Sequence, residues 1–96
     1  MEFRIVLTDE ASHNLDEIAR TDPRKLLKVY KALGLLQTNL RHPSLHTHEF
    51  QSLKGPNGEK VFEAYVESKT PAAYRLFWYH GPEKEQITVF AITPQP

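Results

Sequence analysis

The segment 71–96 constrains the fold most strongly, because it reads as two β-strands joined by a polar turn. The sequences YRLFWY and ITVFAI are rich in residues that favour a half-buried strand. Side chains alternate between the faces of a strand, so the first strand has one face on which an arginine lies among aromatic rings: Arg75, Phe77 and Tyr79. Rings beside a guanidinium suit the binding of nucleobases and phosphate.

Two helices are expected in the first half of the chain, after a short strand over residues 3–7. Thr8 or Asp9 can cap a first helix that ends near Arg20, because apolar residues recur at helical spacing in between. Asp22 followed by Pro23 is a strong start signal for a second helix, which should run to about Asn39.

The second half is expected to add a loop and three strands. Residues 43–59 read as a long irregular loop, anchored on the core by Leu45, Phe50 and Leu53, and residues 60–68 read as a strand. The order strand, helix, helix and three strands predicts an α+β fold, an antiparallel sheet with two helices packed on one face. The whole chain, 1–96, is expected to be one domain.

Composition excludes several kinds of site. The chain has no cysteine, which rules out disulfides, thiolate nucleophiles and sulfur-based zinc sites. No long apolar run or signal peptide is evident, so we expect no membrane contact and a cytoplasmic location.

The net charge is zero, but residues 20–60 carry eight of the twelve basic side chains and only three acids. A basic face on a neutral protein is therefore possible.

The sheet should have one open face. If Phe62, Ala64 and Val66 join Leu76 and Trp78 under the helices, the opposite face is left uncovered. That face would collect a carboxylate, an arginine and stacking rings: Glu63, Tyr65, Arg75, Phe77 and Tyr79.

With this element order, the sequence resembles the RelE/ParE superfamily of toxins from bacterial toxin–antitoxin pairs. The resemblance covers nearly the whole chain. It rests on a Leu-x-Gly step at Leu53–Gly55, on the strand Tyr74-Arg75-Leu76-Phe77-Trp78 and on the final apolar strand at 87–92.

The resemblance implies a ribosome-dependent mRNA endonuclease or, in the ParE branch, an inhibitor of DNA gyrase, neutralised in either case by an antitoxin. Arg75 matches the family's strand arginine that contacts RNA phosphate, and Glu49 lies near the position of a catalytic glutamate in some members. Where several endonucleases end in a catalytic histidine and tyrosine, this chain has Gln95 and Pro96. Gln95 can contact RNA but cannot transfer a proton.

Metal-independent RNA cleavage needs a base, a cation and an acid. We assign Glu49 or Glu63 as the base, Arg75 with Lys54 as the cations, and His46 or His48 as the acid. No metal or cofactor is expected. The alternative role for Arg75 is a structural ion pair with Glu63 across adjacent strands, and for Phe77 and Tyr79 it is packing.

Other residues have weaker signals. Lys54 and Lys60 flank a Gly-Pro-Asn-Gly turn and could clamp phosphate, although exposed lysines beside a turn are common. The spacing His46-x-His48 could serve zinc with further ligands, although loop histidines usually have no such role.

Two function classes remain open. The first is a toxin that cuts ribosome-bound mRNA, with the ribosome, mRNA and a cognate antitoxin as partners; its expected RNA contacts are Lys54, Lys60, Tyr65, Phe77, Tyr79 and Gln95. The second is a binding module of the same fold, acting on gyrase or only on its antitoxin.

Overall fold

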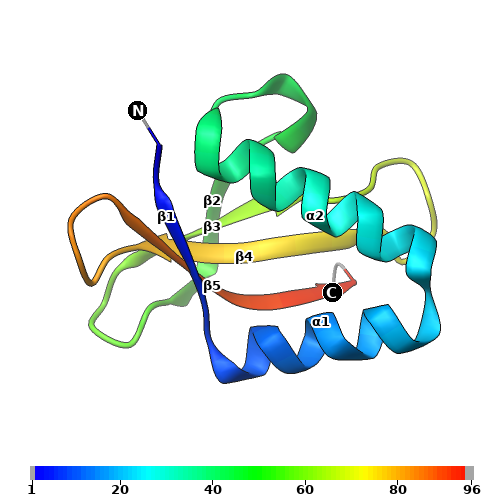
Figure 1. Cartoon of the computed structure of the whole chain (residues 1–96). Helices are drawn as coiled ribbons and strands as arrows, with labels where there is room; N and C mark the ends of the chain where they lie inside the picture. Colours follow the sequence, from blue (N-terminus) through cyan, green and yellow to red (C-terminus); the bar gives the residue numbers. More distant parts are fainter. Residues whose placement is uncertain (1, 95–96) are drawn as a thin grey trace.

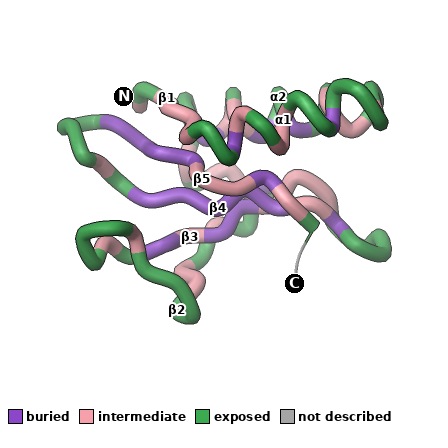
Figure 2. Tube along the Cα trace, turned by 90° about the horizontal axis from the view of Figure 1, so that it is seen from below, coloured by how far each residue is buried: buried purple, intermediate pink, exposed green. Residues whose placement is uncertain are grey.

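The computed structural model describes residues 2–94 as two layers, a pair of helices over a five-stranded sheet (Figure 1). The elements follow in this order: β1 Arg4–Leu7, α1 Asp9–Thr21, α2 Pro23–Thr38, the short 3-10 helix η1 Pro43–Leu45, β2 His48–Lys54, β3 Lys60–Tyr65, β4 Tyr74–His80 and β5 Gln86–Pro94. The predicted α+β class, with both helices on one face of the sheet, is confirmed (Figure 2).

Side-chain caps set the helix starts as the sequence predicted. The hydroxyl oxygen of Thr8 accepts a hydrogen bond from the N–H of Ala11 at 3.2 Å. The carboxylate of Asp22 accepts one from the N–H of Lys25 at 3.1 Å, and Pro23 opens α2. Such caps satisfy N–H groups that lack partners within the helix.

The sheet is mixed, whereas we expected it to be antiparallel throughout. Its strand order is β1-β5-β4-β3-β2, and β1 pairs with β5 in parallel, Ile5 opposite Ile87. The two helices and three further strands separate β1 from β5 in sequence, so no hairpin dictates an antiparallel pairing between them. All other neighbours are antiparallel.

The segment expected to be an irregular loop contains a strand, β2, and this part of the prediction was wrong. The strand pairs with β3 at the edge of the sheet, His48 opposite Glu63, with an irregular register between Glu49 and Lys54. Among residues 2–94 β2 is an edge strand, paired on one side alone, and most of its residues are exposed, so its sequence lacks the apolar alternation of an inner strand. Of the three expected anchors, Leu45 is buried and Phe50 half-buried, but Leu53 is 43% exposed.

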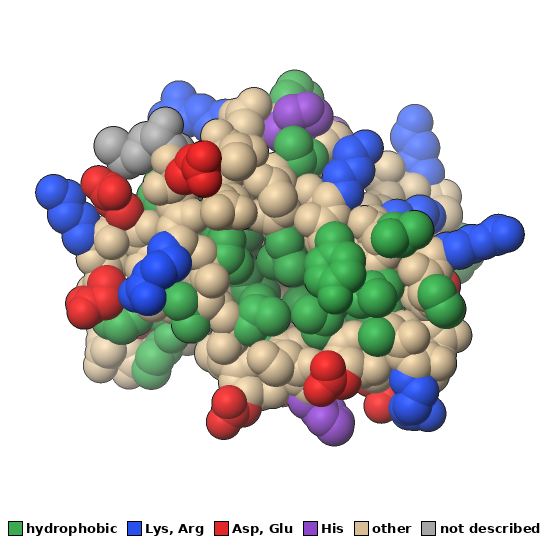
Figure 3. Space-filling view, in the orientation of Figure 1, with side chains coloured by type: hydrophobic (Ala, Val, Ile, Leu, Met, Phe, Trp, Pro, Cys, Tyr) green, Lys and Arg blue, Asp and Glu red, His purple; other side chains and the backbone are tan. Residues whose placement is uncertain are grey.

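The core lies between the helices and the near face of the sheet. Ala64, Leu76 and Trp78 are buried there as predicted, with Phe62 and Val66 packed against them. On the outer side of the helix layer, apolar side chains gather at the centre and charged ones around the rim (Figure 3). Leu27 and Tyr30 of α2 are 69% and 53% exposed, which is unusual for large apolar side chains on one helix.

Candidate functional site

The sheet face away from the helices is closed, and our expectation of an open face was wrong. Phe77 is 4% exposed and Tyr79 is 8% exposed. Phe50 of β2 packs edge-on against Phe77, and Phe90 of β5 contacts both rings, with centroid distances of 5.2 to 6.4 Å. Phe77 and Tyr79 are thus largely covered in this conformation, which favours the packing alternative for these two rings.

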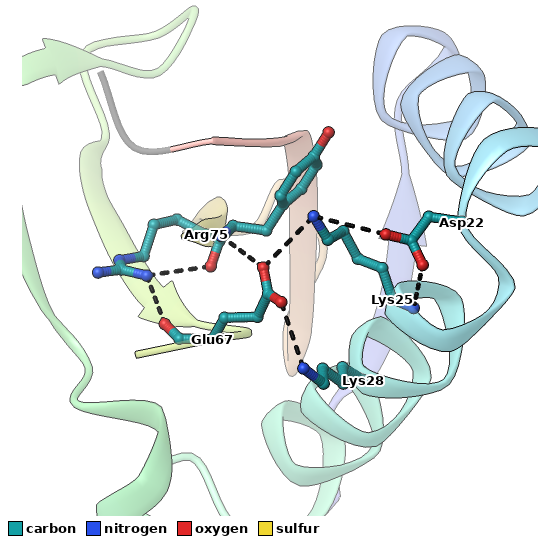
Figure 4. A network of polar contacts seen from close by, with 6 residues as sticks. Asp22, Lys25, Lys28, Glu67 and Arg75 are labelled. Carbon is teal, nitrogen blue, oxygen red and sulfur yellow. Dashed lines mark hydrogen bonds and ion pairs between the residues drawn. The ribbon is translucent and has the colours of Figure 1, made fainter. Parts of the chain in front are cut away.

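Arg75 lies on the same face but is not the cross-strand partner of Glu63 that the alternative interpretation required. In the register of β3 and β4, Arg75 is opposite Tyr65 and Glu63 is opposite Phe77. The guanidinium carbon of Arg75 lies 3.7 Å from the centre of the Tyr65 ring, a cation–π contact. Its Nη1 donates to the carbonyl oxygens of Glu67 at 2.5 Å and Tyr74 at 3.2 Å (Figure 4). The residue is 4% exposed.

Glu67 connects the Arg75 region to helix α2. Its carboxylate accepts the N–H of Tyr74 at 3.2 Å and lies 3.6 Å from Lys25 Nζ and 3.3 Å from Lys28 Nζ. Lys25 also lies over the Tyr74 ring. Burial alone would raise the pKa of Glu67, but the Tyr74 N–H and the two ammonium groups outweigh it and lower that pKa. Figure 4 shows this network reaching from α2 to Arg75.

His48 and Glu63, two of the predicted catalytic residues, are joined directly in the structure. Nε2 of His48 lies 2.8 Å from Oε1 of Glu63, and Nδ1 of His48 lies 2.7 Å from the carbonyl oxygen of His46. The Glu63 side chain is 1% exposed, whereas that of His48 is 48% exposed. Oε2 of Glu63 is buried and has no hydrogen-bond partner among residues 2–94. Among residues 2–94, the side-chain contact of the Glu63 carboxylate is therefore the one that Oε1 makes with His48.

The partners of His48 fix where its protons lie. A carbonyl oxygen only accepts, so Nδ1 must carry a proton. The contact between Nε2 and Oε1 then holds a second proton, which belongs either to an imidazolium facing a carboxylate or to a carboxylic acid facing an imidazole. In both cases His48 and Glu63 share a proton, with the imidazole half-exposed at the surface and the carboxyl group buried beneath it.

Tyr65 lies at the centre of the site. Its ring centre is 4.7 Å from that of His46 and 6.2 Å from that of His48, in addition to the Arg75 contact. His46 adopts a left-handed backbone conformation with φ of 47° at the end of η1. This conformation costs a residue other than glycine on the order of 1 kcal/mol or more, and such strain is often found at functional sites. It directs the His46 carbonyl to His48.

Glu49, Lys54 and Lys60 lie apart from this cluster. Glu49 follows His48 in the strand, so its side chain emerges on the opposite face, and it pairs with Lys54 at 3.7 Å. Lys54 is opposite Lys60 where β2 meets β3, and Lys60 lies three residues, about 10 Å, along β3 from Glu63, the partner of His48. Lys54 also lines a pocket of about 350 Å³ with Tyr79 and Phe90. Lys54 and Lys60 therefore lie toward the start of β3, away from the end that carries Tyr65.

Two further predictions concern metal and the chain end. Among residues 2–94, no three histidine, aspartate or glutamate side chains are grouped so that they could hold a metal ion. Gln95 lies outside the described residues.

Our sequence reasoning missed Glu67 and its lysine partners. Lys25 and Lys28 are spaced i, i+3, which places them on one side of a helix. Nothing in the sequence indicated a carboxylate 39 residues beyond Lys28 as their shared partner.

No model of a known protein family matches the sequence, and no curated protein sequence does. Among solved structures, the chain is similar to a YoeB/ParE toxin from Agrobacterium tumefaciens, with a TM-score of 0.72, 13% identity and coverage of 97% of this chain and 99% of that one. It is also similar to a chain of an archaeal RelE–RelB complex from Pyrococcus horikoshii OT3, with a TM-score of 0.68, 12% identity and coverage of 98% and 96%.

A third similar structure is the toxin–antitoxin complex RelBE2 from Mycobacterium tuberculosis, with a TM-score of 0.62, 21% identity and coverage of 99% of this chain and 100% of that one. The similarity spans both chains almost completely in each comparison, and the element order matches the fold that the sequence resemblance implied. The chain therefore has the fold of the RelE/ParE toxins.

Proposed function

We propose that this protein is the toxin of a toxin–antitoxin pair and that it cuts mRNA on the ribosome in the cytoplasm without a metal ion. Its fold supports the toxin assignment, because the similar solved structures include toxins. The single observation that carries the catalytic assignment is the pair formed by half-exposed His48 and buried Glu63. A surface imidazole held by a buried carboxylate is a common arrangement for a general acid or base.

His48 is the residue that exchanges a proton with RNA. Glu63 holds Nε2, so Nδ1 is the nitrogen that faces the substrate once the RNA displaces the His46 carbonyl. As an acid, Nδ1–H gives its proton to the leaving 5′-oxygen while the ribose 2′-oxygen attacks the phosphorus and its own proton passes to water; the imidazole is left neutral, with Nε2 against Glu63. Because Glu63 is buried, it acts as a positioning residue for His48, whereas we had predicted a direct catalytic role.

Arg75 contributes positive charge close to the reacting phosphate. It lies against Tyr65, whose ring also contacts His46 and His48, so the cation lies one side chain away from the proton-sharing pair. A cation fixed in a partly desolvated site stabilises the charge that develops on a phosphorane. Lys54 and Lys60 act farther along the strand, on a neighbouring part of the RNA.

An antitoxin is the expected protein partner, because the similar solved structures include the toxin–antitoxin complex RelBE2. The exposed apolar side chains Leu27 and Tyr30 on α2 offer it a docking surface with Lys28 and Lys31 beside them. An amphipathic helix with acidic flanks matches such a surface.

Among residues 2–94, no helix is both long and apolar enough to cross a membrane.

The test is cleavage of a defined mRNA on translating ribosomes, with new 5′ ends mapped by primer extension. Wild-type protein should produce cuts that require the ribosome, and His48→Ala should lose them. His13→Ala is the matched control, because His13 is exposed on α1 and outside the site. Equal cutting by His48→Ala and His13→Ala would refute the assignment of His48.

The burial of Arg75 and Phe77 favours a second candidate, a toxin that binds DNA gyrase and cuts no RNA. Because these two side chains are covered, RNA can contact less of the sheet face that lies away from the helices. In that case induction should trigger a DNA-damage response, and purified protein should inhibit gyrase supercoiling. Both effects should be unchanged in His48→Ala, whereas loss of cleavage in that variant supports the first candidate.

A further inference from the structure

A pocket of about 300 Å³ lies between helix α2 and the end of β3, beside the site described above and bordered by its Tyr65. Two lysines of α2, Lys28 and Lys31, line it together with the Tyr65 ring. Hydroxyl groups of Ser44, Ser68 and Thr70 add hydrogen-bond donors, and its remaining walls are mostly apolar. Its volume is at the lower end for a small-ligand pocket and suits a single nucleotide.

The charges in this pocket favour an anion. Glu67 is the one acid among its lining residues, against two lysines. The Glu67 side chain is only 10% exposed and is also held by Lys25, whose side chain is 20% exposed. Lys28 lies at the outer end of the network, 56% exposed (Figure 4). Its ammonium can therefore turn to an incoming anion while Lys25 continues to neutralise Glu67.

The pocket adjoins the proposed catalytic site through Tyr65. This ring forms part of the pocket wall, and it also contacts Arg75, His46 and His48. An RNA strand that places one phosphate at His48 therefore meets this pocket as it continues past Tyr65. This continuity favours RNA over a separate small anion as the occupant.

We propose that the pocket is a phosphate subsite for the RNA strand, in which Lys28 and Lys31 neutralise a phosphate next to the one that is cut. The inference rests on the proposed function. Lysine ammonium groups bind phosphate as point charges, and the hydroxyl groups donate hydrogen bonds to its oxygens. Such a contact fixes the register of the strand and carries no base specificity.

The experiment measures binding of a labelled single-stranded RNA to the full chain as a function of salt. Each phosphate contact on single-stranded nucleic acid adds about 0.7 to the slope of log affinity against log salt. The variant Lys28→Gln/Lys31→Gln should bind RNAs of different sequence more weakly by a similar factor. Its slope should be about 1.4 shallower than that of wild type if both contacts are lost.

Lys84→Gln is the matched control, because Lys84 is an exposed lysine in the turn between β4 and β5. It should keep the wild-type slope. Thermal melting confirms that each variant is folded, and both replaced lysines are exposed, so the fold should persist. The single variant Lys31→Gln, which leaves the Lys28–Glu67 ion pair intact, should lose about half of the slope change.

Two results would overturn the subsite, and they are distinguishable. If wild-type protein binds RNA with a contribution from His48, but the double lysine variant keeps the wild-type slope or changes it no more than Lys84→Gln does, the subsite is wrong and the proposed function stands. If wild-type protein binds no RNA and cuts none on ribosomes, both fail together. Lost affinity for an acidic antitoxin segment with unchanged RNA binding would assign the pocket to that partner and overturn the subsite.

Discussion

Arg75 and Tyr65 face each other across β3 and β4, with the guanidinium carbon 3.7 Å from the centre of the ring. The pair lies between the proton-sharing His48–Glu63 contact and the Glu67 network that leads to α2. A buried cation in this position organises the surrounding side chains in addition to supplying charge.

The first prediction concerns the planar shape of Arg75. Arg75→Lys keeps the charge but loses the flat group that stacks on Tyr65 while donating to two carbonyl oxygens. Its free energy of unfolding should fall by about 1 kcal/mol or more in urea titration. Arg24→Lys, at an exposed position of α2, is the control and should leave stability unchanged. Equal stability of both variants would show that the stack contributes nothing.

The second prediction concerns Glu67 and acid. Its pKa lies below the ordinary value of 4.5 in the folded protein, so the folded state releases this proton more readily than the unfolded state does. The resulting stability is present above pH 4.5 and is lost as the pH falls further. Glu67→Gln should therefore cost about 1 kcal/mol at neutral pH and progressively less below pH 4.5. Urea titrations over this range measure it; a constant difference at every pH would contradict the account.

The third prediction concerns His80. Burial lowers its pKa, because the ring packs against Phe62 and Trp78 although the residue as a whole is exposed. The unfolded chain then binds a proton at a higher pH than the folded one, so stability falls as the pH drops below about 6.5. His80→Phe should keep the packing and remove this part of the acid sensitivity. Urea midpoints at mildly alkaline and mildly acidic pH provide the comparison, and identical pH dependence in both proteins would refute it.

The fourth prediction compares two leucines of the segment 43–59. Leu45 is 1% exposed in the core, so Leu45→Ala should cost about 2 to 5 kcal/mol. Leu53 is 43% exposed on β2, and Leu53→Ala should change stability by no more than about 0.5 kcal/mol. Chemical denaturation of both variants measures the difference. Similar losses would mean that β2 is packed more closely than described.

Much of the fold followed from local patterns. The caps at Thr8 and Asp22 and the alternation in residues 74–79 are local signals, and they predicted both helices and the core-facing side of β4. The strand β2 gave no such signal, because an exposed edge strand needs no apolar alternation. The parallel pairing of β1 with β5 depends on packing between distant segments.

In the candidate site, too, the residue types could be predicted from the sequence, whereas their contacts depend on tertiary structure. His48, Glu63 and Arg75 could be named from the sequence as chemically capable residues. The pairing of His48 with Glu63 could not, because it depends on the register of the unpredicted strand β2. The closure of the far face by Phe50 and Phe90 likewise depends on tertiary packing of side chains from separate strands.

The most direct test of the central claim, that His48 and Glu63 act as one unit in RNA cleavage, is a double-mutant cycle. It measures single-turnover cleavage rates on ribosome-bound mRNA for wild type, His48→Ala, Glu63→Gln and the double variant. Removal of an acid or base typically costs about 10²- to 10⁴-fold, so we predict such a loss for His48→Ala and a smaller one for Glu63→Gln. The double variant should be no slower than His48→Ala, because Glu63 acts only through His48. Losses that multiply, or wild-type rates in His48→Ala, would contradict the account.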